Sequence, residues 1–422
     1  MANTFSREER VMFDDVLEGF DDMLVISKAA TKYEPLSPLE MNRTGDKFWI
    51  PAPGIAVSYD GFDQSANFGD MTETSVPVSI GFHKSSPVKL TAKDLRSPQT
   101  LRLKGDQVKQ KLSSDVNLAL FMTVALQGSQ VVKRTTAPTG FDDIAQADAQ
   151  LTEQGIGLAD RYQFLAPRVY NAMASNLAKP QTSGLAETMN AYKRAEVSND
   201  IAGFRVFKND QSFRLAAATG GTTTVNGANQ YWVPKSTSTA ATGETENVDN
   251  RYSTLAVTAT TYANIKAGDA FTIAGVNSVH MITKQDTGQL QTFRVIGKPS
   301  ANTILVAPAI ISGQGGTRPE LELKNVTATP ASGAAITWLN TVAAELNPFF
   351  KKESLLLIPG SFQVNPEDGW QVMRGTTELG INVTYTRQGE INDLTVKARW
   401  DIDFGTSLTN PMMAGVTLFN QT

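Results

Sequence analysis

The pattern of apolar and polar positions predicts two different helices in the first third of the chain. Over residues 5–30, apolar side chains recur every three or four positions and acidic side chains fill the opposite face, which is typical of an amphipathic helix. Its apolar stripe consists of Phe13, Val16, Phe20 and Leu24. Residues 99–133 carry a longer helical pattern, and some 30 residues of helix at about 1.5 Å per residue would extend about 45 Å. Few compact domains need a helix of that length, so we expect it to act as a spine.

Between about Phe213 and Thr337 the period changes to strict two-residue alternation. Short runs of alternating apolar and polar residues are separated by turn-forming residues, which predicts strands with one buried and one solvated face. The alternating pairs are Leu255/Val257, Phe271/Ile273, Phe293/Val295, Ile304/Val306 and Leu321/Leu323. Several such strands imply a small antiparallel barrel or sandwich, which we interpret as an inserted β domain.

The remaining segments predict mixed structure, so the fold class is α+β. Residues 47–95 combine aromatics, glycine and short alternating runs, which favours an extended two-stranded loop. Residues 141–155 predict a helix, Tyr162–Leu165 a buried strand, and Pro167 the start of another helix. We expect a short helix over residues 338–350 and strands from there to the C-terminus.

Composition excludes several classes of site. The 422 residues include no cysteine, which removes disulfides, thiolate zinc sites and cysteine nucleophiles, and the two histidines, His83 and His280, lie far apart. We therefore expect no metal and no cofactor. The net charge of −4 lacks the basic excess of a free-standing nucleic-acid binder. Neither a signal peptide nor an 18-residue apolar run is present, so we expect no membrane partner.

Charge is unevenly distributed along the chain. Residues 1–40 hold four basic and nine acidic residues, whereas the segment from Lys89 to Lys111 holds seven basic and two acidic. One interpretation is that an acidic N-terminal arm of one subunit lies on the basic segment of a neighbour. The alternative is an ordinary helix packed on its own domain, with two solvated faces that never meet and contribute about 0–1 kcal/mol per exposed pair.

The usual enzymatic motifs are absent from the sequence. It contains no G-x-S-x-G, P-loop, H-E-x-x-H or G-x-G-x-x-G pattern. Asp401 and Asp403 share one face of a predicted strand, and paired carboxylates can act in acid–base catalysis. No third catalytic partner lies nearby in the sequence, and the five tryptophans are scattered, so a glycan-active hydrolase is disfavoured. We expect a protein that is not an enzyme.

Three segments carry a resemblance to a known family. The insertion contains NVDNRY at Asn247–Tyr252, a Lys-Ala-Gly-Asp turn at Lys266–Asp269, and AGV at Ala274–Val276. RYQFLAPRVYNAMASNL (161–177) and RWDIDFGTSLTNPMMAGVTL (399–418) add a strand–Pro–helix and a C-terminal strand. In order and spacing these resemble the major capsid (coat) proteins of short-tailed double-stranded DNA bacteriophages, the group whose capsid fold carries an insertion domain.

The resemblance implies the tailed-phage major capsid (Hong Kong 97) fold. It would make residues 1–44 an N-terminal arm, 45–98 an extended loop reaching over a neighbouring subunit, 99–139 the spine helix and peripheral domain, 140–209 an axial domain, 210–337 an inserted antiparallel β-barrel, and 338–422 the remaining axial and peripheral strands. Charged contacts of the insertion would bridge neighbouring capsomers. The inter-subunit candidates are Asp14, Asp15, Asp21, Asp22, Lys109, Lys111, Lys235, Glu244, Glu246 and Arg251.

The function implied is self-assembly into an icosahedral shell of hexamers and pentamers around the phage genome. The expected partners are further copies of the chain, a scaffolding protein during assembly, a portal protein at one vertex, and packaged DNA contacted without sequence specificity. We expect a precursor shell that expands on DNA packaging, assembly in the host cytoplasm, and final location in the virion. The alternatives are another virion protein, such as a tail or adhesin subunit, and a capsid whose subunits become covalently cross-linked.

Overall fold

The chain forms two units, each assembled from segments that lie far apart in the sequence. A computed structural model describes residues 5–20, 24–33, 47–52, 54–65, 67–177, 200–211, 213–362, 364, 369–377 and 379–422. The first unit combines Met1–Phe48, Val78–Phe121 and Leu355–Ser407. The second combines Trp49–Pro77, Met122–Ser354 and Leu408–Thr422. Asp21 and Asp22 lie outside the described residues.

The first unit is built on a mostly antiparallel sheet. Its strands are β1 (Thr31–Lys32), β20 (Leu355–Pro359), β23 (Thr395–Leu408), β22 (Asn382–Glu390) and β21 (Gln371–Thr376) in spatial order, with β4 (Phe82–Thr91) also paired to β23. Tyr385 and Trp400 are opposite each other on β22 and β23, and both are fully buried. The predicted strands near the C-terminus are thus confirmed in β20, β22 and β23.

Helix α1 (Arg7–Phe20) covers one face of this sheet. Its stripe residues Phe13, Val16 and Phe20 are buried, and Phe13 lies against Tyr385 with ring centroids 6.5 Å apart. Leu24 has an extended backbone (φ −90°, ψ 90°) and precedes a separate short helix, α2 (Val25–Ala29). The prediction of one continuous helix over 5–30 is therefore wrong, although the stripe that motivated it is buried as expected.

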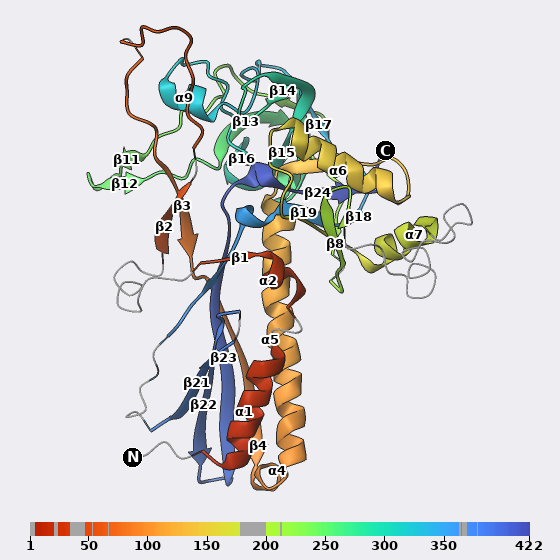
Figure 1. Cartoon of the computed structure of the whole chain (residues 1–422), viewed down its shortest axis with the longest axis vertical. Helices are drawn as coiled ribbons and strands as arrows, with labels where there is room; N and C mark the ends of the chain where they lie inside the picture. The colour runs from red at the N-terminus through yellow and green to blue at the C-terminus, as the bar shows by residue number, and fades with distance from the viewer. Residues whose placement is uncertain are drawn as a thin grey trace. The chain divides into compact units, whose positions relative to one another are not determined.

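Helix α5 (Pro98–Gln127) is the long helix that the sequence predicted (Figure 1). Pro98–Phe121 belongs to the first unit and Met122–Gln127 to the second. Its buried residues Leu112, Val116, Leu120 and Val124 repeat at four-residue steps. The predicted extension to residue 133 is wrong, because Gln130–Lys133 forms strand β5, which pairs in parallel with the C-terminal strand β24 (Ala414–Leu418).

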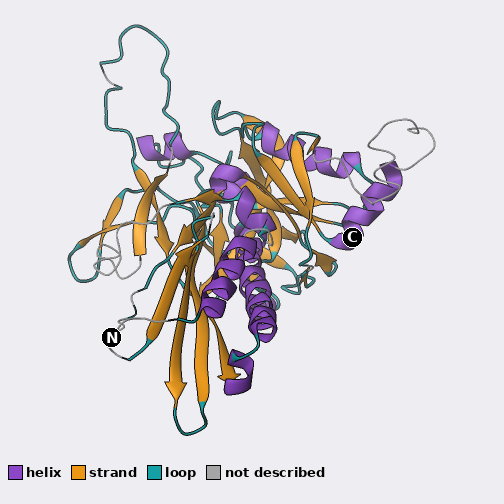
Figure 2. Cartoon of the chain, turned by 60° about the horizontal axis from the view of Figure 1, so that its bottom comes forward, coloured by secondary structure: helices purple, strands orange, loops and turns teal. Residues whose placement is uncertain are grey.

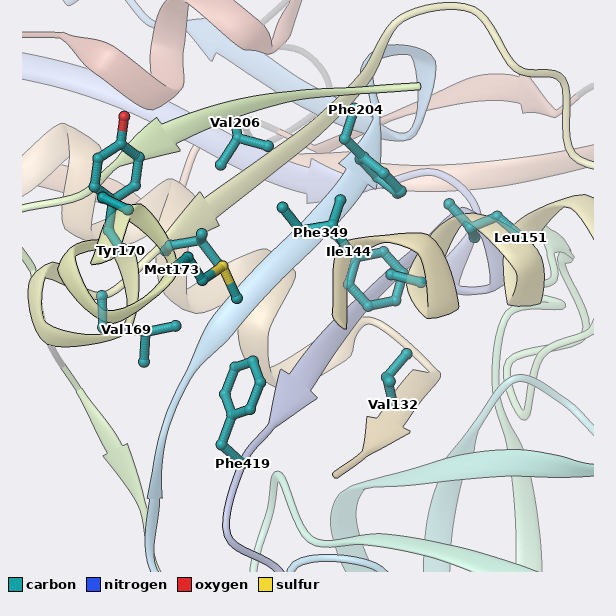
Figure 3. Close-up of a cluster of buried hydrophobic side chains, with 14 of the residues drawn as sticks. Val132, Ile144, Leu151, Val169, Tyr170, Met173, Phe204, Val206, Phe349 and Phe419 are labelled. Carbon is teal, nitrogen blue, oxygen red and sulfur yellow. The ribbon is translucent and has the colours of Figure 1, made fainter. Parts of the chain in front are cut away.

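The second unit contains another sheet, covered by two helices. Its strands run in the order β5, β24, β19 (Asn347–Lys351), β6 (Arg161–Leu165), β8 (Phe204–Lys208) and β7 (Asp200–Ile201). Helices α6 (Phe141–Glu153) and α7 (Pro167–Leu177) confirm the two predicted helices of this region. Figure 3 shows side chains from both helices, among them Ile144 and Met173, packed around Phe349 of the sheet.

A closed barrel forms a second part of this unit. Its strands close in the order β10 (Thr223–Val225), β13 (Ser253–Ala259), β16 (Thr303–Ala307), β15 (Asp286–Ser300), β14 (Ala270–Val279) and β17 (Ala335–Trp338). Four of the five alternating pairs predicted from the sequence point into its core: Leu255/Val257, Phe271/Ile273, Phe293/Val295 and Ile304/Val306 are all buried. The two-residue period predicted these strands correctly because each of them has one face buried in the barrel core.

Two predictions near the barrel are wrong. Leu321 and Leu323 lie in a helix, α9 (Arg318–Leu323), because Thr317 and Glu320 form a capping box and Pro319 occupies its first turn. The helix expected over 338–350 is instead the end of β17, the short strand β18 (Ala344–Glu345) and β19. β18 pairs with β9 (Arg214–Leu215), so long-range pairing overrides local helix propensity there.

Strands β2 (Lys47–Ala52) and β3 (Thr74–Ser79) pair with each other and border a long connecting segment. Figure 2 shows the described residues between them as a wide loop without helix or strand. The alternating run at Val57–Phe62, within the segment expected to form an extended two-stranded loop, forms no strand. We call residues 54–73 the β2–β3 loop.

Candidate assembly surfaces

A buried ion pair holds the first turn of α1 on its own sheet. The carboxylate of Glu9 accepts hydrogen bonds from Ser6 N and Ser6 Oγ, each at 3.0 Å, and pairs with the guanidinium of Arg387 on β22. Arg387 also lies over the Phe5 ring, 4.7 Å from its centroid. For residues 7–20, the structure therefore supports the alternative of a helix packed on its own domain and not that of a detached arm.

The acidic helix and the basic segment meet within one chain. Asp15 Oδ2 lies 3.3 Å from Arg102 Nε, and both side chains are about half exposed. An open groove of about 370 Å³ follows this contact, lined by Met12, Asp15, Val16, Glu18, Gly19, Arg102, Asp106 and Lys109. The charge complementarity inferred from the sequence is real, but the structure shows it inside a subunit.

The other charged candidates of this region differ in availability. Lys109 pairs with Asp106 at 3.0 Å and its side chain is largely buried, whereas Lys111 pairs with Asp115 at 2.6 Å and remains 68% exposed. Asp14 is exposed on α1. Asp14 and Lys111 are therefore better placed than Lys109 to contact another molecule.

The candidates of the insertion lie on and beside a short hairpin of β11 (Thr237–Thr239) and β12 (Thr245–Asn247). Lys235, Glu244 and Glu246 are exposed there, which keeps them candidates for contacts with a neighbouring subunit. The hairpin stands clear of the barrel strands in Figure 1.

Arg251 differs from the other candidates, because the structure engages its guanidinium inside the chain. Its side chain is 11% exposed and is engaged inside the chain. The guanidinium binds Asp249 through Nε at 2.9 Å and Nη2 at 2.7 Å, and Nη1 donates to Leu408 O at 2.7 Å. Arg251 therefore stabilises the base of the hairpin through contacts inside the chain.

Asn250 is a structural residue that the sequence reasoning missed. Its Oδ1 accepts from Trp232 Nε1 at 3.0 Å and Lys235 N at 3.1 Å, and its Nδ2 donates to Lys235 O at 2.8 Å. Together with the Asp249–Arg251 pair, these bonds fix the path of the chain into and out of the hairpin. The NVDNR motif thus builds a support for the hairpin.

The β2–β3 loop exposes four large apolar side chains. Phe62 is fully exposed, and Tyr59, Phe68 and Met71 are also exposed. The loop's four charged residues, Asp60, Asp63, Asp70 and Glu73, are all acidic and exposed. Scattered exposed apolar residues are normal, but a cluster of aromatics on one loop is typical of an interaction site.

Of the two carboxylates considered for catalysis, Asp401 has a structural role. Asp401 is buried and accepts from Arg399 Nε at 2.7 Å (Oδ2) and 3.0 Å (Oδ1) and from Arg399 Nη2 at 2.5 Å (Oδ1), and His83 Nε2 lies 3.4 Å from its Oδ1. Among the described residues, no group of three or more His, Cys, Asp or Glu side chains is placed to hold a metal ion. Within the same part of the chain, no helix has the length and apolar character needed to cross a membrane.

Structural comparison finds phage capsid proteins. The capsid of cyanophage P-SCSP1u matches at 12% identity, covering 94% of this chain and 88% of the other, with a TM-score of 0.45. A Mycobacterium phage Che8 structure matches at 11% identity over 93% and 90% of the two chains, with a TM-score of 0.43. The coat protein I-domain of CUS-3 is 40% identical and covers 29% of this chain and 99% of that domain, with a TM-score of 0.22.

Sequence comparison with family models gives a match over nearly the whole length. The model described as P22 coat protein, gene protein 5, matches residues 1–420. The matched residues include α1, α5, the barrel strands and the C-terminal strands. The chain therefore belongs to the P22 coat protein family.

Proposed function

We propose that this chain is the major capsid protein of a tailed phage and that its copies assemble as hexamers and pentamers into a closed icosahedral shell around the genome. The observation that carries the proposal is the family match over residues 1–420. It favours a coat protein over a tail or adhesin subunit. A structural role in the virion, without enzymatic activity, accords with a family of coat proteins.

The β2–β3 loop supplies a physical reason for assembly. Burying one phenylalanine side chain contributes roughly 1.5–3 kcal/mol, and this loop exposes Tyr59, Phe62 and Phe68 together. Association loses translational and rotational freedom worth an estimated ~4–15 kcal/mol, so one such loop gives a weak contact. A weak contact can dissociate, so a wrongly placed subunit can leave. Once subunits close into rings, many such contacts act together.

The finer parts of the proposal concern the route to the shell. We propose that a scaffolding protein directs assembly in the host cytoplasm, that a portal protein occupies one vertex, and that the precursor shell expands as DNA is packaged. DNA would be contacted without sequence specificity, and the chain's net charge of −4 supports weak contact with DNA phosphates. Asp14 and Lys111, with Lys235, Glu244 and Glu246 of the hairpin, are the charged candidates for contacts between copies.

Expression of the full chain tests the proposal directly. Purified subunits, with and without the scaffolding protein from the same phage, are followed by light scattering and negative-stain electron microscopy. We expect closed shells of uniform diameter with the scaffold present. Monodisperse subunits that form no shells under either condition would contradict the proposed function.

A matched pair of variants tests the loop. Phe62→Ser removes the most exposed aromatic of the β2–β3 loop, while Ile282→Ser removes another exposed apolar side chain, in the turn between β14 and β15 of the barrel. We expect Phe62→Ser to lower the yield of shells and Ile282→Ser to leave it unchanged. Equal yields from both variants would exclude the loop as an assembly contact.

A further inference from the structure

Helix α9 is a short platform whose position is fixed by its own buried bonds. Glu320, which is fully buried, accepts from Thr317 N at 3.1 Å, Thr317 Oγ1 at 2.7 Å and Gly315 N at 3.1 Å. Just beyond the helix, Asn325 binds the barrel edge: its Oδ1 accepts from Ile311 N at 3.0 Å and its Nδ2 donates to Ala309 O at 2.7 Å. Both ends of α9 are therefore tied down.

Two side chains of this platform hold the β2–β3 loop, about 250 residues away in sequence. Arg318 Nη1 donates to Gly69 O at 2.5 Å and to Asn67 O at 3.4 Å. Glu322 accepts from Thr72 N at 3.0 Å. An ion pair of 2.9 Å between Arg318 Nε and Glu322 Oε1 joins the two, and the loop runs beside α9 in Figure 1.

We call Arg318 and Glu322, with their hydrogen bonds to the loop, the clamp. Its atoms lie close enough to the loop to constrain it. The Glu322 side chain is only 4% exposed. Burial would raise the pKa of Glu322, but Arg318 and the hydrogen bonds of Thr72 lower it overall, which keeps the carboxylate charged. A Cβ atom added at Gly69 would lie 2.8 Å from Arg318 Nη1, so the guanidinium, at the end of a flexible side chain, would have to shift away from Gly69.

The tip of the loop is ordered by bonds of its own. Gln64 Nε2 donates to Gly61 O at 2.7 Å, and Asn67 Nδ2 donates to Gln64 Oε1 at 2.7 Å. The clamp grips the loop next to this tip, at Asn67, Gly69 and Thr72, and leaves Phe62 and Phe68 facing solvent. A loop that is already ordered loses less conformational entropy when it binds a neighbour.

We propose that Arg318 and Glu322 are positioning residues for shell assembly, through which the inserted barrel presets the β2–β3 loop for docking on a neighbouring copy. The inference rests on the proposed function, because it requires that the loop make contacts between subunits. The competing explanation is that the clamp stabilises only the barrel itself.

A loop-side variant separates these explanations without altering the barrel. Gly69→Ala should shift the Arg318 guanidinium away from Gly69 O and weaken that hydrogen bond, whereas Gly54→Ala is a matched control in the same loop, since its Cβ would make only an ordinary contact with Thr72 O at 3.9 Å. Arg318→Met removes the clamp from the other side. The double variant Gly69→Ala/Arg318→Met shows whether both changes act through one contact.

Two readouts apply to unassembled full-length subunits and to assembly. We expect Gly69→Ala and Arg318→Met to speed chymotrypsin cleavage after Tyr59, Phe62 or Phe68 several-fold, with the double variant no faster than Arg318→Met alone. Assembly followed by light scattering should slow by about tenfold, the factor that corresponds to 1.4 kcal/mol of added ordering. Gly54→Ala should match the parent chain, and Arg318→Lys should recover part of the rate.

The outcomes separate the inference from the proposed function. Faster cleavage with an unchanged assembly rate, or unchanged cleavage in both variants, would overturn the positioning role while shells still form. A fall in the melting temperature of the full chain for Arg318→Met but not for Gly69→Ala, with assembly slowed only by the former, would favour the purely stabilising explanation. A parent chain that forms no shells would remove the proposed function and this inference with it.

Discussion

The carboxylate of Glu9 and the guanidinium of Arg387 form an ion pair that solvent barely reaches, with side-chain exposures of 1% and 17%. The pair ties the first turn of α1 to strand β22. Because Glu9 also caps the helix through Ser6, one side chain both starts the helix and attaches it to the sheet.

Removing one partner of this pair should loosen α1. We expect Glu9→Gln to lower the free energy of unfolding by roughly 2–3 kcal/mol, as for the loss of a charged hydrogen bond in a buried site. Urea denaturation of unassembled subunits measures this. In a double-mutant cycle, Arg387→Met should add little to Glu9→Gln, and additive losses would argue against direct coupling of the two side chains.

Tyr385 offers a prediction of the opposite sign. Its ring packs on Trp400 at a centroid distance of 4.5 Å, but its buried hydroxyl makes no hydrogen bond with the described residues. We expect Tyr385→Phe to leave the free energy of unfolding unchanged or to raise it by up to about 1 kcal/mol, because an unpaired buried hydroxyl is removed. A loss as large as that of Tyr385→Ala would show that the hydroxyl has a partner.

Gly415 should not tolerate a side chain. It lies in β24 opposite Gln130 of β5, and an added Cβ would collide with the carbonyl oxygen of Gln130. We expect Gly415→Ala to destabilise the chain by about 1–3 kcal/mol through overpacking. Gly297→Ala in β15 is the control, because its Cβ would meet open space. Equal melting temperatures for the two variants would contradict the close approach.

Lys284 predicts a dependence of stability on pH. Burial, followed by the nearby charge of Lys324, lowers the pKa of Lys284 to about 8. Between pH 8 and the ordinary lysine value of about 10.4, the unfolded chain binds more protons at this site than the folded chain, so this group makes stability rise with pH. Asparagine tolerates the positive φ of 57° at this position, so the Lys284→Asn variant should fold but lose that rise of stability with pH. If the melting temperatures of parent and variant changed with pH in the same way over pH 7.5–10, the shifted pKa would be contradicted.

Lys111 tests the charge complementarity between subunits. Its side chain is exposed, so we expect Lys111→Glu to slow assembly at low salt, with the difference shrinking as salt screens the contact. Loss of the pair with Asp115 costs only about 0.3–0.5 kcal/mol of helix stability. Lys111→Gln separates loss of charge from its reversal. Unchanged light-scattering kinetics at all salt concentrations would exclude Lys111 from the assembly contacts.

The sequence predicted elements well where one periodic pattern decided the structure. The barrel strands around Val257 and Ile273 alternate strictly, and α5 holds its helical period for many turns. It failed where a short local signal competed with a pattern. Around Leu321, the Thr317–Glu320 capping box and Pro319 outweighed two alternating leucines, and that signal was readable in the sequence.

The candidate sites were harder to predict because they depend on contacts between distant residues. Charge alone cannot show that Arg251 is occupied by Asp249 and Leu408 O, or that Asp15 meets Arg102 inside one chain. The aromatics of the β2–β3 loop were visible in the sequence, but their exposure was not. The clamp from Arg318 to Gly69 joins residues about 250 positions apart, and no local pattern announces it.

The polypeptide enters and leaves the barrel through β9 and β18, which pair side by side, Leu215 opposite Ala344. A segment whose two ends are neighbours can be gained, lost or exchanged by a single genetic event without disturbing the register of the strands that flank it. Replacing residues 216–343 with a foreign domain whose termini are equally close would leave those flanking strands intact. Because Arg251 and Arg318 also bind Leu408 O and Gly69 O, such an exchange would keep the junction but remove these two ties to the rest of the chain.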